Sequence, residues 1–303
     1  MAVVASALAA ANVAAAVAAD PGRWVLTARK TTSVSYWQGV TFDPGARAFS
    51  FDGLSKGLYR TTASLARTAG VGDVIPSSVK RAEGYNHLGD LSFDPENSNQ
   101  LGDLSFDAAG GRLLLPLECY YPGRPNGGNT CQTGAIAVAD PLSLSWRYYV
   151  KLDPAYIEKA MWAEVSPDGR WIWTSSGRSL LAYRAAQVNA ANAAPAGPAL
   201  VPKRLTGVLP TSAVSGATFY RGRLLVALDR GGYLEVVSYD IDMSGPDPVL
   251  VGGARREIER MKSAFVYESE GLAAANALNG ELHWQIQPQI PLYGQIISFR
   301  PTG

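Results

Sequence analysis

The sequence predicts an all-β fold, and three observations support this prediction. Of its 303 residues, 47% are hydrophobic and 17% are charged, which suits one large core and excludes a disordered chain. Helical periodicity is nearly absent, whereas short runs of β-branched and aromatic residues recur between Gly, Pro, Asn and Asp. A longer repeat, of roughly fifty residues, is superimposed on these runs.

The first 19 residues carry no charge and end in Val17-Ala18-Ala19, directly before Asp20. Small residues at this position are typical of a signal-peptide cleavage site. We therefore predict a signal peptide over 1–19 and a secreted domain over 20–303, with no membrane contact after cleavage. The alternative is a short Ala-rich helix that belongs to the fold.

The predicted strands are short and apolar, and turn residues separate them. In chain order they cover residues 24–28, 40–42, 48–51, 112–115, 135–138, 171–174, 223–227, 234–239 and 295–299.

The longer repeat predicts the architecture. One unit recurs, in which a small or polar pair, an apolar strand, a turn and a more apolar strand follow each other. Its copies begin near residues 38, 89, 163, 215 and 270. Such spacing is typical of propeller blades, because radial repetition protects the sheet edges.

We therefore predict a single β-propeller with five blades, or six if 61–84 or 185–210 hides a divergent blade. The strand at 24–30 has no unit of its own. We expect it to join the C-terminal blade and close the ring.

A tandem duplication interrupts the second unit. Residues 88–94 are repeated at 101–107. A shift by an odd number of residues reverses the two faces of a strand, so only one copy can hold the inner position, and we assign it to the first.

The two cysteines, Cys119 and Cys131, are too few for a zinc cluster or an iron–sulfur site. Export permits a disulfide, and the loop between them is rich in Pro, Gly and Asn. We predict that they pair, the alternative being two buried thiols.

Charge and motifs exclude several function classes. Lys and Arg number 27 and Asp and Glu 26, so the near-neutral chain lacks the basic surface of a nucleic-acid binder. No nucleophile elbow, P-loop, dinucleotide fingerprint or zinc-protease motif is present. We expect a monomer that binds a small molecule or a glycan at the channel mouth.

Polar residues near the start of each unit define the candidate metal site. The first strand of every blade lines the channel, so Gln38, Asp90, Glu164 and Glu270 converge there. Gathered carboxylates repel one another unless a cation or proton relieves them, and Ca²⁺ prefers such oxygen ligands. The alternative is that these groups only hydrate a water-filled channel.

Two further residues are candidates for catalysis. The chain has two histidines, and His87 lies at the start of a predicted inner strand, where it could act as a general base or a ligand. Glu118 ends the second strand of the same unit. The alternative for His87 is a hydrogen-bonded structural histidine, and we expect His283 to pack within its blade or to lie on the surface.

Several inner-strand phrases resemble those of secreted bacterial propellers in the gluconolactonase, strictosidine-synthase-like and lactonase-type groups. They are the segments 165–171, 38–40 and 269–272. In the gluconolactonase-like group the channel holds Ca²⁺ through a Glu-Gly phrase, and Glu270-Gly271 matches that phrase. The resemblance implies a cation that polarises a lactone carbonyl or a phosphoryl group.

Three functions follow as hypotheses. The first is a secreted Ca²⁺-dependent hydrolase of esters, lactones or related small molecules, with His87 or Glu118 as the base. The second is a non-catalytic extracellular propeller that holds a glycan or protein on aromatic loops at 36–37, 119–121 and 146–149. The third is a glycosidase that uses two carboxylates among Asp90, Glu164 and Glu270.

Overall fold

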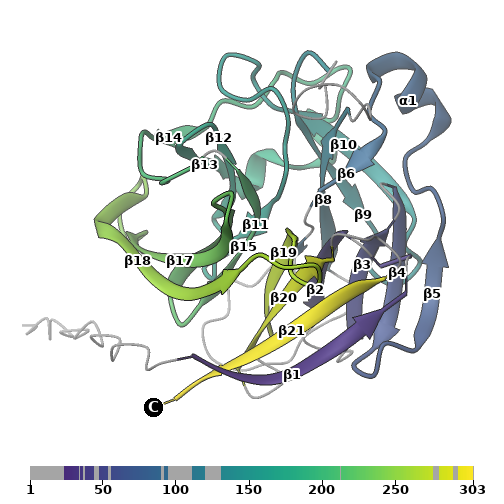
Figure 1. Cartoon of the computed structure of the whole chain (residues 1–303). Coiled ribbons are helices and arrows are strands. Elements are labelled where there is room, and N and C mark those ends of the chain that lie inside the picture. The colour runs from purple at the N-terminus through teal and green to yellow at the C-terminus, as the bar shows by residue number, and fades with distance from the viewer. Residues whose placement is uncertain are drawn as a thin grey trace, which may run out of the picture.

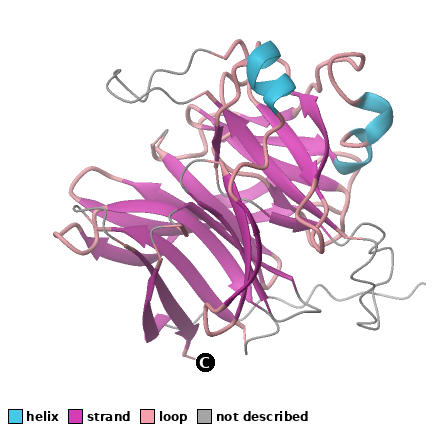
Figure 2. Ribbon diagram, turned by 90° about the vertical axis from the view of Figure 1, so that its right-hand side faces the viewer, coloured by secondary structure: helices cyan, strands magenta, loops and turns pink. Residues whose placement is uncertain are grey.

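The chain forms five β-sheets arranged around a common centre in the computed structural model (Figure 1). The structure describes residues 24–33, 35–36, 38–43, 48–53, 56–89, 92–94, 111–119, 131–211, 213–275, 280–288 and 293–302. Strands dominate these residues, and helices are few and short (Figure 2). The all-β prediction is confirmed, and the arrangement is a propeller.

The sheets are numbered I to V in chain order of their first strands. Sheet I contains β2 (Gln38–Asp43), β3 (Ala48–Gly53), β4 (Gly57–Thr62) and β5 (Arg67–Val71). Sheet II contains β6 (His87–Leu88), β7 (Ser92–Asp94), β8 (Arg112–Glu118), β9 (Ala135–Ala139) and β10 (Trp146–Lys151), and α1 (Ser77–Glu83) precedes it. Sheet III contains β11 (Glu164–Val165), β12 (Trp171–Ser176), β13 (Ser179–Arg184) and β14 (Lys203–Leu205), with two 3-10 helices at Ala185–Gln187 and Ala190–Asn192.

Sheet IV contains β15 (Val214–Tyr220), β16 (Arg223–Asp229), β17 (Tyr233–Asp242) and β18 (Val249–Met261). Sheet V contains β19 (Glu268–Ala275), β20 (Glu281–Gln287), β21 (Gly294–Pro301) and the N-terminal strand β1 (Trp24–Thr32). Within every sheet, hydrogen-bonded neighbours are antiparallel.

The first strands of the sheets meet at the centre. β2 contacts β7, β7 contacts β11, β11 contacts β15, β15 contacts β19, and β19 contacts β2. In Figure 1 the labels β2, β11, β15 and β19 accordingly surround the middle of the molecule. The later strands of each sheet lie progressively further out.

The strand pairing shows that the predicted repeat units do not form equal sheets. Four of the sheets have four strands each, whereas sheet II has five, because its inner position is shared by the short strands β6 and β7. The described residues contain no sixth sheet: 61–84 contributes β5 and α1, and 185–210 contributes the 3-10 helices and β14. The second copy of the duplication, 101–107, lies outside the described residues, as does the predicted signal peptide.

The N-terminal strand pairs with the C-terminal strand, as the sequence predicts. β1 runs antiparallel to β21, with Trp24 opposite Pro301 and Thr32 opposite Gly294. Figure 1 shows the two strands side by side along one edge of the molecule.

Both faces of a sheet are covered by neighbouring sheets, which explains the continuous apolar runs in the second strands. In β20, Trp284 and Ile286 pack with Ala227 of β16 in sheet IV. On the opposite face of the same strand, the His283 ring lies 4.7 Å from the ring of Phe42 in sheet I. Side chains that alternate along one strand therefore pack into the two layers on either side of the sheet.

A buried ionic network joins sheets IV and V. Arg223 donates to Glu257 Oε1 at 2.8 Å and to Asp240 Oδ1 at 2.8 Å, and the side chain of Arg223 is buried. Trp24 Nε1 donates to the other oxygen of Glu257, Oε2, at 3.0 Å. Glu257 sits where the register of β18 shifts against β17, between the partners of Val236 and Val237. The irregularity places this carboxylate between the two sheets.

We expect Glu257→Ala to lower the free energy of unfolding by about 3 kcal/mol, because it leaves the Arg223 guanidinium buried beside only one carboxylate. The control is Glu259→Ala on the same strand, where the carboxylate pairs with the exposed Arg256 at 2.9 Å and its loss should cost less than about 0.5 kcal/mol. Urea unfolding of the two variants measures the difference. Equal losses would contradict a role for the buried network.

Candidate functional site

The two residues predicted to carry catalysis lie against each other. His87 begins β6 and is paired with Glu118, the last residue of β8. His87 Nδ1 lies 2.8 Å from Glu118 Oε1, and both side chains are buried. The two atoms are at ion-pair distance, and the contact places the Glu118 carboxylate on the Nδ1 side of the ring.

The pair lies at the inner edge of sheet II. Several inner strands begin with a polar residue. His87 is such a starting residue, as are Gln38 of β2 and Glu268 of β19.

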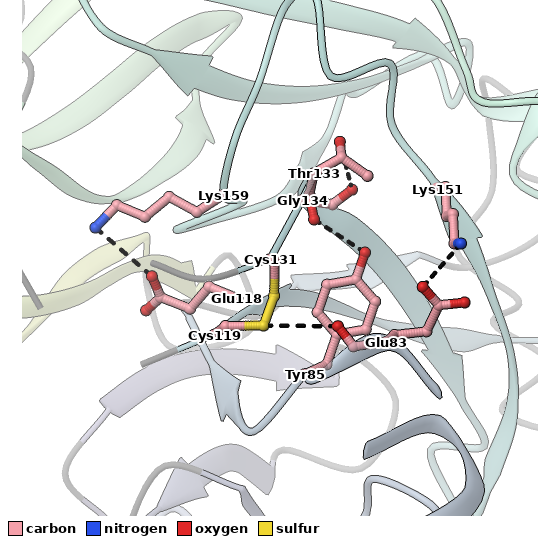
Figure 3. The surroundings of a disulfide bond; sticks show 9 residues. All are labelled: Glu83, Tyr85, Glu118, Cys119, Cys131, Thr133, Gly134, Lys151 and Lys159. Carbon is pink, nitrogen blue, oxygen red and sulfur yellow. Dashed lines mark hydrogen bonds and ion pairs between the residues drawn. A yellow bond between two sulfur atoms is a disulfide. The ribbon is translucent and has the colours of Figure 1, made fainter. Parts of the chain in front are cut away.

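Lys159, in the connection that leads to sheet III, completes the cluster, which we call the His87–Glu118–Lys159 cluster. Lys159 Nζ lies 3.6 Å from Glu118 Oε2 (Figure 3). The segment is held in place by the Ala160 amide, which donates to the Leu117 carbonyl at 3.4 Å. Sequence reasoning missed Lys159, because it lies between strands, where no periodic pattern marks it.

Glu164, a predicted calcium ligand, is used between two sheets. Its Oε1 accepts hydrogen bonds from the Phe219 amide at 3.0 Å and the Thr218 hydroxyl at 3.2 Å, both on β15. Glu164 pairs with Trp173, within β12, whereas His87 pairs with the last residue of β8. The carboxylate thus satisfies a backbone amide on the inner edge of β15.

Glu270 and Gln38, the other described calcium candidates, lie at irregular positions on adjacent inner strands. Glu270 falls where the β19 register shifts against β20, and Gln38 lies beside a similar shift on β2. Bulges of this kind re-aim side chains at sheet edges and near functional sites. The Gln38 carbonyl oxygen Oε1 is buried and has no hydrogen-bond partner among the described residues.

The fit to a calcium ion is partial. Among the described parts of the chain, no group of three or more His, Cys, Asp or Glu side chains is placed to hold a metal. Asp90 lies outside the described residues. The buried, unpartnered oxygen of Gln38 is the one observation that suits an oxygen-seeking cation.

Ser269 is a second feature that the sequence did not predict. Its hydroxyl accepts a hydrogen bond from Trp284 Nε1 at 2.8 Å and another from the Ser215 hydroxyl at 2.5 Å. The two serines join the inner strands β15 and β19 next to Glu270. A serine between two glutamates at the start of a strand gives no distinctive sequence signal.

The aromatic residues proposed as binding platforms serve the core where they are described. Tyr149 is buried and donates to Glu83 Oε1 at 3.0 Å, and its ring lies 6.0 Å from that of Trp146. Tyr36 is buried against Tyr59, with ring centroids 5.5 Å apart. Residues 37, 120 and 121 lie outside the described residues.

Cys119 and Cys131 form a disulfide, with Cα atoms 5.4 Å apart. The prediction of this pair is confirmed. No helix in the described residues is long and apolar enough to cross a membrane.

Comparison with known proteins shows the fold. No protein-family profile matches the sequence, and no curated protein does. Among solved structures, a glutaminyl cyclase from Myxococcus xanthus is similar over 93% of this chain and 98% of that chain, with a TM-score of 0.51 and 13% identity. The PQQ-bound aldose sugar dehydrogenase of Streptomyces coelicolor is aligned over 92% of this chain and 98% of that chain, with a TM-score of 0.42 and 11% identity.

His283, the second histidine, occupies a different environment. It is buried, its Nδ1 lies 2.9 Å from the Ser298 hydroxyl, and Phe42 covers its ring. Burial, with a smaller contribution from the positive charge of Lys30, lowers its pKa from 6.5 to about 3. His283 is therefore neutral in the folded protein at neutral pH.

This shift predicts a loss of stability in acid. Between pH 6.5 and about 3 the unfolded chain binds a proton at His283 that the folded protein does not, so the free energy of unfolding falls as the pH is lowered. We expect His283→Gln to make that decline shallower by roughly 1 kcal/mol per pH unit. Urea unfolding of wild type and variant across this range measures it, and parallel curves would refute the assignment.

Proposed function

We propose that the protein is a hydrolase of small esters or lactones, with His87 as the general base. The contact between His87 Nδ1 and Glu118 Oε1, at 2.8 Å between two buried side chains, is the observation that supports this proposal. A base held by a second group is the arrangement that general-base catalysis requires. The substrate class is taken from the resemblance of the inner-strand phrases.

Each member of the cluster has a defined role in this proposal. His87 Nε2 accepts a proton from water as the oxygen of that water attacks the carbonyl carbon. Glu118 holds the Nδ1 proton and stabilises the positive charge that forms on the ring. Lys159 limits the rotation of the Glu118 carboxylate, since its ammonium lies 3.6 Å from Oε2.

Two variants test the roles on a panel of ester and lactone substrates. A peptide with an N-terminal glutamine is added, because a glutaminyl cyclase is similar in fold. We expect His87→Gln to lower kcat by about 100-fold or more, and Glu118→Gln by at least about tenfold, with little change in KM.

The matched control is His283→Gln, which removes the chain's only other imidazole and should leave kcat unchanged at neutral pH. Near-UV circular dichroism verifies that each variant is folded. Turnover that persists in His87→Gln would overturn the assignment of the base.

We also propose a Ca²⁺ site at the predicted channel mouth, held by Gln38, Glu270 and Asp90. Support comes from the buried Gln38 Oε1, which has no hydrogen-bond partner among the residues that the structure describes, and from the contact between the strands β2 and β19 that carry Gln38 and Glu270. Glu164 is left out, because its carboxylate is bonded to β15. A bound cation would supply electrophilic assistance to the carbonyl group.

Calorimetric titration with Ca²⁺ tests this site without reference to activity. We expect Gln38→Met and Glu270→Gln each to weaken binding by more than about tenfold. Glu259→Gln, at an exposed carboxylate on β18, is the control and should bind like wild type. No binding heat and no metal in elemental analysis of the wild-type protein would refute the proposal.

Location and assembly complete the proposed function. We propose a secreted monomer in which the five sheets act as five blades, closed by the pairing of β1 with β21. The disulfide supports an oxidising compartment, and the circle of contacts between the first strands supports one closed ring. A small molecule or glycan would enter at the mouth that carries His87.

A further inference from the structure

The disulfide lies beside both chain segments that supply the proposed base. Glu118 is the last residue of β8, and Cys119, which follows directly, is buried. Cys119 Sγ lies 3.9 Å from the carbonyl oxygen of Glu83, four residues before His87 (Figure 3). The sulfur thus contacts the segment that leads to the imidazole and is bonded to the residue next to its carboxylate partner.

Close packing and hydrogen bonds fix the segment from α1 to His87 beside the disulfide. Gly84 ends α1 with φ +83°, and a Cβ atom there would lie 3.3 Å from Cys119 Sγ, so a glycine gives both the turn and the close approach. Tyr85 is buried and donates to the Thr133 carbonyl at 2.9 Å, two residues beyond Cys131. The Asn86 amide then donates to the Glu118 carbonyl at 3.2 Å.

The other half of the disulfide leads to Lys159. Thr133 donates through its hydroxyl to the Ile157 carbonyl at 3.0 Å. A Cβ atom on Gly134 would lie 2.6 Å from the Ala160 nitrogen and 2.9 Å from the Lys159 carbonyl carbon, so a glycine here lets the Lys159 backbone pack closely. Cys131 therefore holds the lysine side of the cluster as Cys119 holds the His87–Glu118 side.

The sheet itself does not depend on this bond. β8 and β9 are paired from Leu113–Ala139 to Leu117–Ala135, and their side chains are buried in the core. Breaking the disulfide leaves this ladder in place and releases only its end, where Glu118 and His87 sit. The consequence of reduction is therefore local.

We propose that the Cys119–Cys131 disulfide and Tyr85 are positioning residues for the His87–Glu118 contact, and that a dithiol reductant releases the contact. A thiolate attacks the sulfur of Cys131, a partly exposed residue, the Cys119 sulfur leaves, and the second thiol of the reductant then resolves the mixed disulfide. Two electrons and two protons pass to the protein, which gains two thiols, and the dithiol becomes a cyclic disulfide. The consequence for catalysis rests on the proposed function, whereas the contact itself does not.

The test uses the full chain labelled with ¹⁵N histidine. With two histidines, the spectrum contains two imidazoles, and His283→Gln assigns them. In the oxidised protein we expect His87 to show widely separated Nδ1 and Nε2 shifts, as one dominant tautomer requires. After dithiothreitol treatment, with two thiols per chain confirmed by titration, these two shifts should move toward each other while those of His283 stay in place.

Variants separate positioning from general stability. Cys119→Ala with Cys131→Ala should reproduce the reduced spectrum without reductant, and Tyr85→Phe should move His87 in the same direction. The matched control is Tyr149→Phe, which removes a hydrogen bond to Glu83 in the same region and should leave His87 unchanged.

Two outcomes would overturn the proposal: His87 shifts that do not change when the disulfide is cleaved, or a simultaneous change of both histidines, which would mean that the bond only supports the fold. An activity measurement forms a separate arm, in which reduction should lower kcat by about tenfold or more on any substrate that wild type turns over. If no substrate is turned over, the proposed hydrolase function fails, and the spectroscopic test still decides whether the disulfide positions His87.

Discussion

Each sheet of this protein must bury both of its faces, and the rest of the structure depends on this constraint. An isolated four-stranded sheet with apolar residues on both sides is not stable in water. Neighbours on either side provide the cover, as Trp284 on one face and His283 on the other face of β20 illustrate. The arrangement that gives every sheet two neighbours is a circle, and the first strands meet around it in turn.

The same constraint decides what happens to polar groups between sheets. A buried donor or acceptor needs a partner, and in a ring that partner often belongs to the next sheet. Glu164 bonds to the Phe219 amide across sheets III and IV, and Glu257 joins Arg223 to Trp24 across sheets IV and V. A position near the centre therefore does not by itself make a carboxylate a metal ligand or a catalytic group.

The sequence predicts much of the fold because the repeat is visible in it. Apolar second strands, turn residues and the unpaired strand at 24–30 are enough to place the sheets and the pairing of β1 with β21. The meeting of His87 with Glu118 also follows from the pattern, since one begins a first strand and the other ends a second strand of the same unit. The split of the inner strand into β6 and β7 could not be predicted. The two copies of the duplicated segment have the same sequence, so either of them could supply the inner strand.

What the sequence cannot supply is the choice among chemically equal groups. Glu164 and Glu118 are both acids in apolar surroundings, yet one is bonded to a backbone amide and the other faces an imidazole and an ammonium. Lys159 enters from a connection with no periodic pattern, so only the packing of Gly134 against its backbone reveals where it lies. These differences arise from contacts between residues far apart in the chain.

The two histidines show how such contacts separate chemical roles. Both are buried, and at His283 burial opposes a positive charge on the ring. The neighbouring charges differ: Lys30 adds to the effect of burial at His283, whereas the Glu118 carboxylate lies 2.8 Å from Nδ1 of His87. The Glu118 carboxylate is itself held by Lys159 at 3.6 Å, so the His87 ring faces an ion pair where the His283 ring faces Phe42. The difference in environment between the two imidazoles thus follows from which neighbouring sheet or segment each one faces.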